Sequence, residues 1–135
     1  MILFIDTTGF HQLRFALIEV GGKGKAKEKI YKVDHSQSAK TLGYFIKFFG
    51  KTKWSEIEKI IVVSGPGSFS GIRVGLAMAL AFSLARGIPA FAVSEEIVPK
   101  KLASLVALKK GLKKINSHFN PEYGAEPNIT PSKKK

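Results

Sequence analysis

Apolar and polar positions along the chain predict alternating strands and helices. Apolar runs at residues 2–6 and 13–18 have the length and composition of strands, and short unbroken apolar runs at 60–63 and 90–93 are typical of central, buried strands. Residues 26–33 predict a further strand whose lysines place it at an exposed edge, because charge there discourages unwanted strand pairing. The chain is therefore expected to contain a sheet with a charged edge and a buried centre.

Helical spacing of apolar residues separates these strands. The pattern predicts a helix at residues 36–49 with Ser36 as its N-cap, a second from 71 to 86, a last one from 94 to 112, and a short helical turn at 54–60. Hairpins that come first and helical crossovers that come later predict an α/β domain, with a mixed five-stranded sheet and helices packed on it.

The composition fits one compact domain. The chain has 135 residues, of which 44% are hydrophobic, so general disorder is excluded. It has no cysteine, which excludes disulfides, cysteine-bound zinc, iron–sulfur clusters and a thiol nucleophile, and its three histidines are too scattered for a local metal site. Residues 1–115 are expected to form the domain, and residues 116–135 a basic extended tail. With no signal peptide and no long apolar run, a cytoplasmic protein without membrane contact is expected.

The charge of the chain is strongly positive. Lysine and arginine number 22 against 10 acidic residues, which gives a net charge of +12. The excess is uneven, because residues 98–135 hold nine lysines and two glutamates. Such a balance suits either a solvated surface or contact with a polyanion. Only three of the basic residues are arginines, so recognition of individual bases is not expected.

The helix expected at 71–86 is apolar on nearly every side, with Arg73 and Ser83 as its strongly polar members. A helix of this kind requires burial all round. Small residues recur along it every four positions and form a ridge that lets another helix backbone come close. The ridge consists of Gly71, Gly75, Ala79 and Ser83. The chain's own helix at 36–49 could cover it, but in so small a domain we expect a partner helix to do so.

Residues that could carry chemistry are few. The glycine-rich loop at 65–71 leads into a helix N-terminus, which offers N–H groups to an anion, but it has neither a Walker A lysine nor a nucleophile-elbow serine. Its serines, Ser68 and Ser70, are interpreted as helix caps. Asp6 ends the first strand and could orient a nucleotide–metal complex or cap the following turn, and the sequence leaves both roles open. No pair of carboxylates is placed for acid–base or metal chemistry.

Three motifs in the chain resemble the TsaB (YeaZ) family. They are Ile5-Asp6-Thr7-Thr8, His35-Ser36-Gln37 and the stretch from Ser64 to Gly75. The likeness covers about residues 1–108, and the glycine-rich stretch is its specific part.

The resemblance implies an actin-like (ASKHA, RNase H-like) lobe with a non-catalytic role. Members of the family support TsaD, the subunit that transfers a threonylcarbamoyl group to adenosine beside the anticodon of tRNA. They pair with TsaD through their first two helices, which correspond to residues 36–49 and 71–86 here. The partner-binding residues expected on this basis are His35, Ser36, Phe45, Phe69, Gly71, Ile72, Arg73, Gly75, Met78, Ala79 and Phe82. Weaker, nucleotide-binding candidates are Asp6, Thr7, Thr8, Gly65 and Gly67.

Family members carry a second lobe beyond the matched region, and residues 109–135 do not resemble it. The ATPase TsaE, tRNA held within the complex, and a homodimer formed in the absence of TsaD are the other partners that the family implies. No cofactor is expected on this chain alone, whereas ATP with Mg²⁺ belongs to the complex. Two alternatives stay open: a nucleotide-dependent kinase-like or peptidase-like enzyme of the same superfamily, and a basic RNA-binding module.

Overall fold

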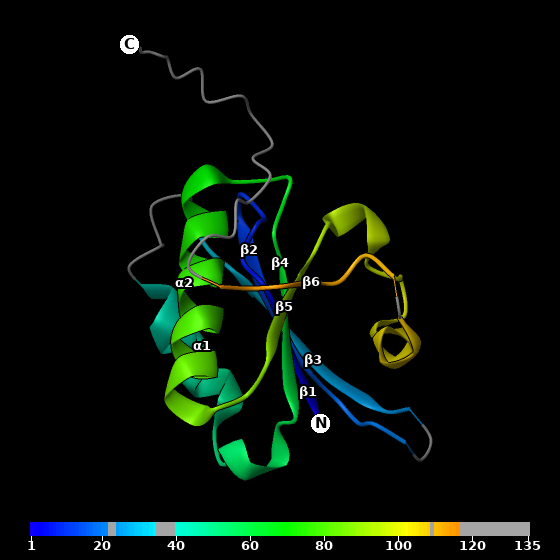
Figure 1. Cartoon of the computed structure of the whole chain (residues 1–135). Helices are drawn as coiled ribbons and strands as arrows, with labels where there is room; N and C mark the ends of the chain where they lie inside the picture. The colour runs from blue at the N-terminus through cyan, green and yellow to red at the C-terminus, as the bar shows by residue number, and fades with distance from the viewer. Residues whose placement is uncertain (22–23, 35–39, 109, 117–135) are drawn as a thin grey trace.

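The chain folds around one mixed sheet, with both α-helices on the same face (Figure 1). The computed structural model describes residues 1–21, 24–34, 40–108 and 110–116. The strands, α-helices and short 3-10 helices (η) are β1 (Ile2–Asp6), β2 (Gln12–Ile18), β3 (Ala26–Lys32), α1 (Thr41–Phe49), η2 (Trp54–Glu56), β4 (Lys59–Val63), α2 (Phe69–Arg86), β5 (Ala90–Val93), η3 (Glu95–Ile97), η4 (Leu102–Ala107) and β6 (Lys113–Lys114).

The six strands lie in the order β3-β2-β1-β4-β5-β6. β1, β2 and β3 form an antiparallel meander. β4 and β5 run parallel to β1, because a helix returns the chain across one face before each of them begins. The short β6 pairs antiparallel with β5. A mixed sheet with helices packed on it confirms the predicted fold class, and β6 is an addition to the five strands expected.

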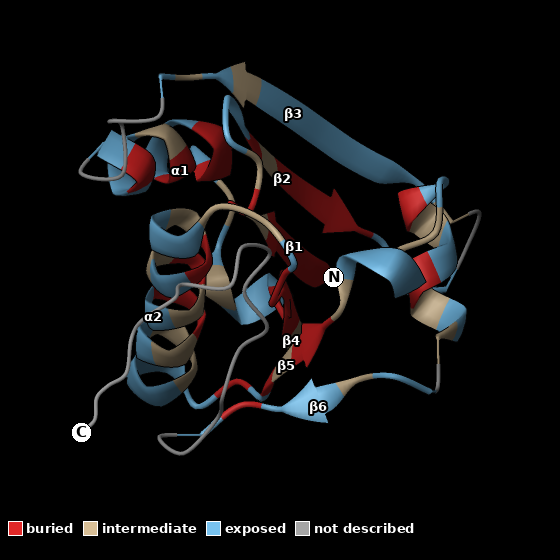
Figure 2. Ribbon diagram, turned by 90° about the horizontal axis from the view of Figure 1, so that it is seen from above, coloured by how far each residue is buried: buried red, intermediate tan, exposed pale blue. Residues whose placement is uncertain are grey.

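Hydrophobic residues of the central strands are buried on both faces of the sheet (Figure 2). On one face, Phe15 and Val62 pack with Phe45 of α1 and Met78 of α2. On the other face, β1 and β4 pack beneath η4, where Leu105 is fully buried. This burial on two sides explains the unbroken apolar runs of the central strands.

The lysine-rich edge strand is confirmed. β3 lies at one end of the sheet, and its lysines are exposed. Two of them turn toward aromatic rings on the helix side: Lys27 Nζ lies 5.5 Å from the centre of the Phe48 ring, and Lys29 Nζ lies 5.7 Å from that of Tyr31. Their stems cover apolar surface while their charges stay in water.

The two α-helices lie where the apolar spacing predicts them. The Ser68 hydroxyl caps α2 by accepting a hydrogen bond from the N–H of Gly71 (3.2 Å), which confirms Ser68 as a helix cap. α2 ends at Gly87, whose φ of +67° is the left-handed conformation that glycine adopts without strain. α1 is described from Thr41 onward, and its expected N-cap, Ser36, lies outside the described residues.

The helix predicted at 94–112 is wrong. This segment forms the 3-10 helices η3 and η4, followed by β6. Pro99 lies beyond the first turn of the predicted helix, where its missing N–H and its ring would break the α-helical hydrogen bonds. Leu102 and Leu105 are both buried, and a spacing of three residues suits a 3-10 turn.

The packed part of the chain extends at least to Ile115. This side chain is buried, and its N–H donates a hydrogen bond to the carbonyl oxygen of Ala90 (2.9 Å). The last 19 residues, 117–135, lie outside the described part of the chain, so the extended tail stays a prediction.

Candidate functional site

The ridge of small residues on α2 faces the chain's own sheet. A Cβ atom at Gly71 would overlap the carbonyl oxygen of Thr7, and one at Gly75 would overlap the Thr7 hydroxyl. That hydroxyl donates a hydrogen bond to the carbonyl oxygen of Gly71 (2.5 Å). Glycine is required here because any larger side chain would push α2 away from the end of β1.

The expectation that this ridge meets a partner helix is therefore wrong. The residues of α2 that are buried against the sheet are Ile72, Gly75, Met78 and Ala79, and all four were expected to bind a partner. A stripe of small side chains predicts a close approach of backbone, but it does not identify the backbone that approaches. In this fold it is the turn after β1.

The opposite side of α2 carries exposed apolar residues. Only four of its 18 residues are buried. Leu84 is 76% exposed and Phe69 is 42% exposed, while Ala77 and Ala81 between them are exposed as well. Figure 2 shows the outer side of this helix in the colours of exposed and intermediate residues. The described residues therefore cover only one side of α2, although this helix is apolar on nearly every side.

α1 extends this apolar surface. Leu42 and Ile46 lie one turn apart and are 49% and 62% exposed. Beside them, between the two helices, is a groove of about 310 Å³, which we call the aromatic groove. It is lined by Leu42, Phe45, Ile46, Phe49, Gly50, Trp54 and Phe82.

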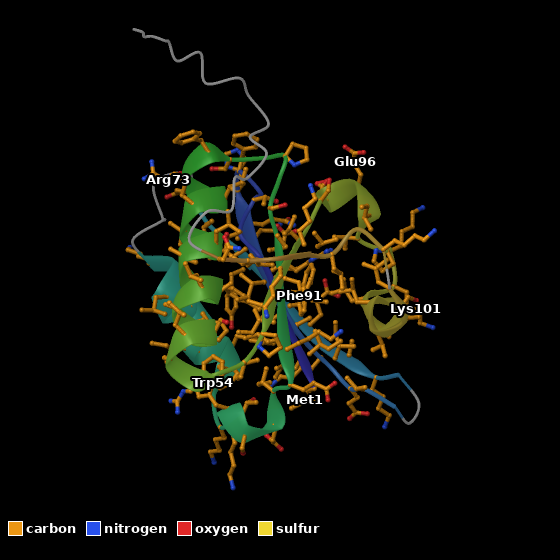
Figure 3. The ribbon with its side chains drawn as sticks, viewed as in Figure 1. Met1, Trp54, Arg73, Phe91, Glu96 and Lys101 are labelled. Atoms are coloured by element: carbon orange, nitrogen blue, oxygen red, sulfur yellow. The ribbon has the colours of Figure 1, made fainter. Side chains whose placement is uncertain are left out.

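Packed rings form the wall of the aromatic groove. The ring centroids of Phe45 and Phe82 are 5.0 Å apart, and the ring of Trp54 lies 4.9 Å from Phe82 and 4.5 Å from Phe49. Figure 3 places Trp54 at the lower end of the two helices. The sequence assigned Trp54 only to a helical turn. The signal that could have found it is a large aromatic residue soon after Gly50, which ends α1.

Every charged residue on the two helices is basic. Lys47 of α1 and Arg73 and Arg86 of α2 are exposed. The sequence contains no aspartate or glutamate from residue 35 to 55 or from residue 59 to 94. The Arg86 guanidinium lies 5.5 Å from the centre of the Trp54 ring, at the aromatic groove. The helix face therefore combines apolar surface with positive charge only.

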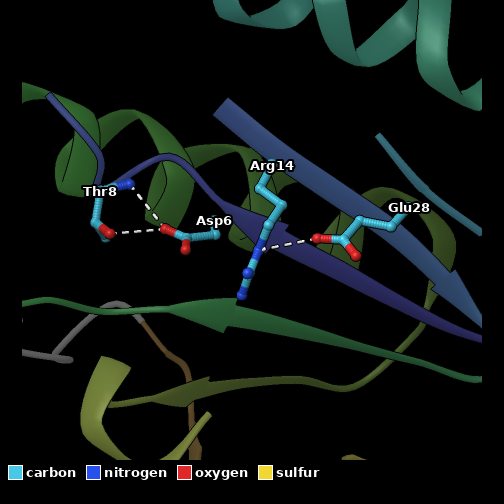
Figure 4. A network of polar contacts seen from close by, with 4 residues as sticks. All are labelled: Asp6, Thr8, Arg14 and Glu28. Atoms are coloured by element: carbon cyan, nitrogen blue, oxygen red, sulfur yellow. Dashed lines mark hydrogen bonds and ion pairs between the residues drawn. The ribbon is translucent and has the colours of Figure 1, made fainter. Parts of the chain in front are cut away.

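The residues expected to bind a nucleotide hold β1 to α2 instead. Asp6 Oδ1 accepts hydrogen bonds from the N–H (3.0 Å) and the hydroxyl (2.7 Å) of Thr8 (Figure 4). Thr7 and Thr8 are 1% and 4% exposed, and the N–H of Ser68 donates to the Thr8 carbonyl oxygen (2.7 Å). Gly67 packs on Thr8 so closely that a Cβ atom would overlap it. Of the two roles left open for Asp6, the structure shows the turn cap.

The space beside this turn is small. The cavity lined by Thr7, Ser68 and Gly71 has a volume of about 20 Å³, which holds a water molecule but not a phosphate group. Gly65 is also engaged, because its carbonyl oxygen accepts a hydrogen bond from the N–H of Glu95 (2.8 Å). Among the described residues, no group of three or more His, Asp or Glu side chains could hold a metal ion.

Arg14 stands opposite Asp6 in the β1–β2 register, but its charge is directed elsewhere. Its Nε lies 3.6 Å from Glu28 Oε2, and its guanidinium lies 5.2 Å from the centre of the Phe4 ring (Figure 4). Arg14 thus links β2 to the edge strand β3 on the face away from α1 and α2. The Asp6 carboxylate therefore bonds within the turn, to Thr8.

An antiparallel meander, two further parallel strands and two helices on one face define an actin-like, RNase H-like lobe, as the motifs indicated. A family model described as "TsaD: tRNA N6-adenosine threonylcarbamoyltransferase" matches residues 30–98, just over half of the chain. The chain belongs to this family. No curated protein matches it in sequence.

Solved structures share the fold. YeaZ from Pseudomonas aeruginosa matches with a TM-score of 0.62 and 18% identity, over 86% of this chain and 64% of that one. An uncharacterized protein with similarity to peptidase YEAZ, from the same organism, gives 0.60 and 19%, over 86% and 63%. RuvC from T. thermophilus in complex with a Holliday junction substrate gives 0.53 and 13%, over 84% and 98%.

These comparisons confirm the resemblance to the TsaB (YeaZ) family that the motifs indicated. The family model and the fold point to the same group of proteins, although the chain spans less than two thirds of the length of the YeaZ structures. The chain also matches RuvC, over 98% of the RuvC chain. The YeaZ structures, RuvC and this chain share one lobe, and the described residues form that lobe.

α2 by itself is long and apolar enough to cross a membrane, with a mean hydropathy of 1.3 over 18 residues. A single helix of this kind is weak evidence for a membrane. Here its first turn is bonded to the end of β1, and its small-residue side packs on β4. The α/β fold suggests a soluble protein.

Proposed function

We propose that the chain is a TsaB-like, non-catalytic subunit that binds a TsaD-family transferase through α1 and α2 and supports threonylcarbamoyl transfer to adenosine beside the anticodon of tRNA. The observation that carries this proposal is the apolar face of the two helices that the other described residues leave exposed, on which Leu42, Ile46 and Leu84 are each about half exposed or more. Membership of the family and the YeaZ-like fold support it.

Burial of this face would drive association. Apolar surface removed from water contributes about 25 cal/mol per Å², and contiguous apolar patches on a soluble lobe mark interaction sites. The exposed Ala77 and Ala81 let the backbone of a partner helix come close to α2. Phe69 and Arg73, in the first turns of α2, are exposed, and both are proposed as partner contacts.

A supporting role suits the residues around Asp6 better than catalysis does. The carboxylate of Asp6 and the hydroxyls of Thr7 and Thr8 are committed to hydrogen bonds within the lobe. A kinase-like or peptidase-like enzyme needs such groups free to meet a substrate. ATP with Mg²⁺ is accordingly assigned to the complex rather than to this chain.

The remaining partners follow from the same proposal. His35 and Ser36 lie outside the described residues and stay proposed contacts, because they directly precede the segment that leads into α1. Exposed lysines on the side of the sheet away from the helices, such as Lys101, would face tRNA held by the complex (Figure 3). TsaE, and a homodimer in the absence of TsaD, are further proposed partners, and the proposed location is the cytoplasm.

Co-expression with the TsaD-family subunit of the same genome tests the proposal. We expect one complex whose mass equals the sum of both chains. Ile46→Asp should abolish co-elution, because it places a charge on the apolar helix face. Ile30→Asp is the matched control, since Ile30 is 45% exposed on the edge strand β3 and should leave the complex intact. Co-elution that survives Ile46→Asp in a folded chain contradicts the proposed face.

A further inference from the structure

We infer that the aromatic groove receives one bulky apolar side chain from an amphipathic helix of the partner, and that this helix carries acidic residues beside that side chain. The inference deepens the proposed function, on which it depends for the identity of the partner. The chemistry of the partner helix is argued from the groove itself.

The apolar half of the inference comes from the shape and lining of the groove. The groove has a volume of about 310 Å³ and is lined by rings and aliphatic side chains, with Gly50 as its one residue without a side chain. Ile46 is 62% exposed at its rim, whereas Phe45 is 2% exposed beneath it. Aromatic pockets of this kind are where one large partner side chain contributes most of the binding energy. A small or polar side chain would leave the rings in contact with water.

The acidic half comes from the charges around the groove. Arg86 lies over the Trp54 ring, and Lys47 is exposed in the last turn of α1, on the helix that forms the other wall. Neither helix has an acidic residue that could neutralise them. A guanidinium that lies over an aromatic ring at a docking surface still has N–H groups that can donate hydrogen bonds. It therefore favours a carboxylate on the partner.

The same charges argue against a second copy of the chain as the occupant. Two identical helix faces would bring Lys47, Arg73 and Arg86 of one copy toward those of the other, and neither α1 nor α2 has a carboxylate to pair with them. The acidic side chain nearest to Lys47 in the sequence, Glu56 of η2, already accepts a hydrogen bond from the N–H of Lys53 (3.2 Å). Like charges placed across an interface cost binding energy and exclude wrong partners. A different chain, with an apolar side chain for the aromatic rings and acidic residues beside it for the cations, fits both features of the groove.

Trp54 makes occupation of the groove directly measurable. It is the only tryptophan in the chain, and it lines the groove. Its fluorescence emission therefore reports contact at this place and nowhere else in the protein. The measurement does not require the transferase, so it separates the chemistry of the groove from the identity of the partner.

The experiment titrates the full chain with two stapled, tryptophan-free helical peptides. Both carry the same leucine and phenylalanine stripe, flanked by glutamates in one peptide and by lysines in the other. We expect the glutamate peptide to shift Trp54 emission to shorter wavelength and to bind about tenfold more tightly than the lysine peptide. Arg86→Gln should weaken the glutamate peptide about fivefold. Lys29→Gln, which removes a cation over Tyr31 at the edge strand, should not.

Three results would overturn the inference. One is equal binding of the two peptides, and another is no change of Trp54 emission with either peptide. The third is a dimer in analytical ultracentrifugation whose formation alone shifts the emission, because the occupant is then a second copy. Failure of the transferase to co-elute, combined with tight binding of the glutamate peptide, rejects the proposed partner and leaves the inference standing. Co-elution that is unaffected by Arg86→Gln, with no peptide binding, rejects the inference alone.

Discussion

The hydroxyl of Thr7, at the turn after β1, is hydrogen-bonded to the carbonyl oxygen of Gly71 in the first turn of α2, 64 residues further along the chain. The N–H of Ser68 adds a second bond to the same turn, at the carbonyl oxygen of Thr8 (2.7 Å). These bonds fix the helix that carries the exposed apolar face to the central strand of the sheet. Changes on the inner side of α2 should therefore act on the stability of the lobe.

Gly75→Ala is expected to lower the free energy of unfolding by about 1–3 kcal/mol, because the added Cβ atom overlaps the Thr7 hydroxyl. Urea unfolding followed by circular dichroism measures this change. Gly43→Ala is the control, since nothing lies within 4 Å of a Cβ atom at Gly43, an exposed residue in the first turn of α1. It should stabilise the lobe by up to about 1 kcal/mol through helix propensity.

Combining Gly75→Ala with Thr7→Ala identifies the clash. Removal of the Thr7 hydroxyl makes room for the new methyl group, so the double variant should be less destabilised than the sum of the two single variants. Simple additivity in the unfolding data would mean that the methyl group is accommodated in another way.

Asp6→Ala is expected to cost about 1–3 kcal/mol of stability, because it leaves the N–H and the hydroxyl of the buried Thr8 without their charged acceptor. Asp34→Ala, at an exposed aspartate, should change stability by less than about 0.5 kcal/mol. Calorimetric titration of the unaltered chain with Mg-ATP should give no saturable heat. Tight binding that disappears in Asp6→Ala would instead favour the kinase-like enzyme.

Leu84→Asp is expected to weaken binding to the transferase subunit by tenfold or more while the folded lobe keeps its melting temperature. Leu84 is 76% exposed, so the carboxylate stays in water in the free chain and is buried only in the complex. Surface plasmon resonance with both variants measures the effect. Val20→Asp, at a 43% exposed position after β2, is the control and should bind as the unaltered chain does.

Exposed lysines of β6 are expected to add to tRNA binding by the complex. Replacing Lys113 and Lys114 with glutamine should reduce the slope of log affinity against log salt concentration by about 1 to 2, because fewer counterions are released from the RNA. The same change at Lys27 and Lys29, in the strand at the other end of the sheet, tests whether the effect is local. Equal slopes for all three proteins would show that tRNA does not reach β6.

Local signals predicted most of the fold. Unbroken apolar runs identified the central strands, helical spacing identified α1 and α2, and the lysines between Ala26 and Lys32 identified an edge strand. Each of these features depends on neighbours a few residues away, or on burial that composition alone reveals. The serine cap of α2 was predictable for the same reason, because Ser68 and Gly71 are close in sequence.

Features that depend on distant contacts were not predictable. The small residues of α2 look the same in the sequence whether they meet a partner or the chain itself. Here they meet Thr7, in the turn after β1. Trp54 becomes part of a groove only because α2 brings Phe82 to within 4.9 Å of its ring. The 3-10 helices after β5 follow from the position of Pro99 and from a spacing of apolar residues that an α-helix also allows.

Both outer strands of the sheet, β3 and β6, are rich in lysine. Strand-by-strand growth from either edge is therefore disfavoured, because a further strand would have to align beside a row of positive charges. On one face of the sheet η4 covers apolar side chains of β1 and β4, whereas on the other face the described residues leave apolar side chains of α1 and α2 exposed. Association through apolar surface is therefore directed to the helix side, while the lysine-rich edges oppose open-ended growth of the sheet.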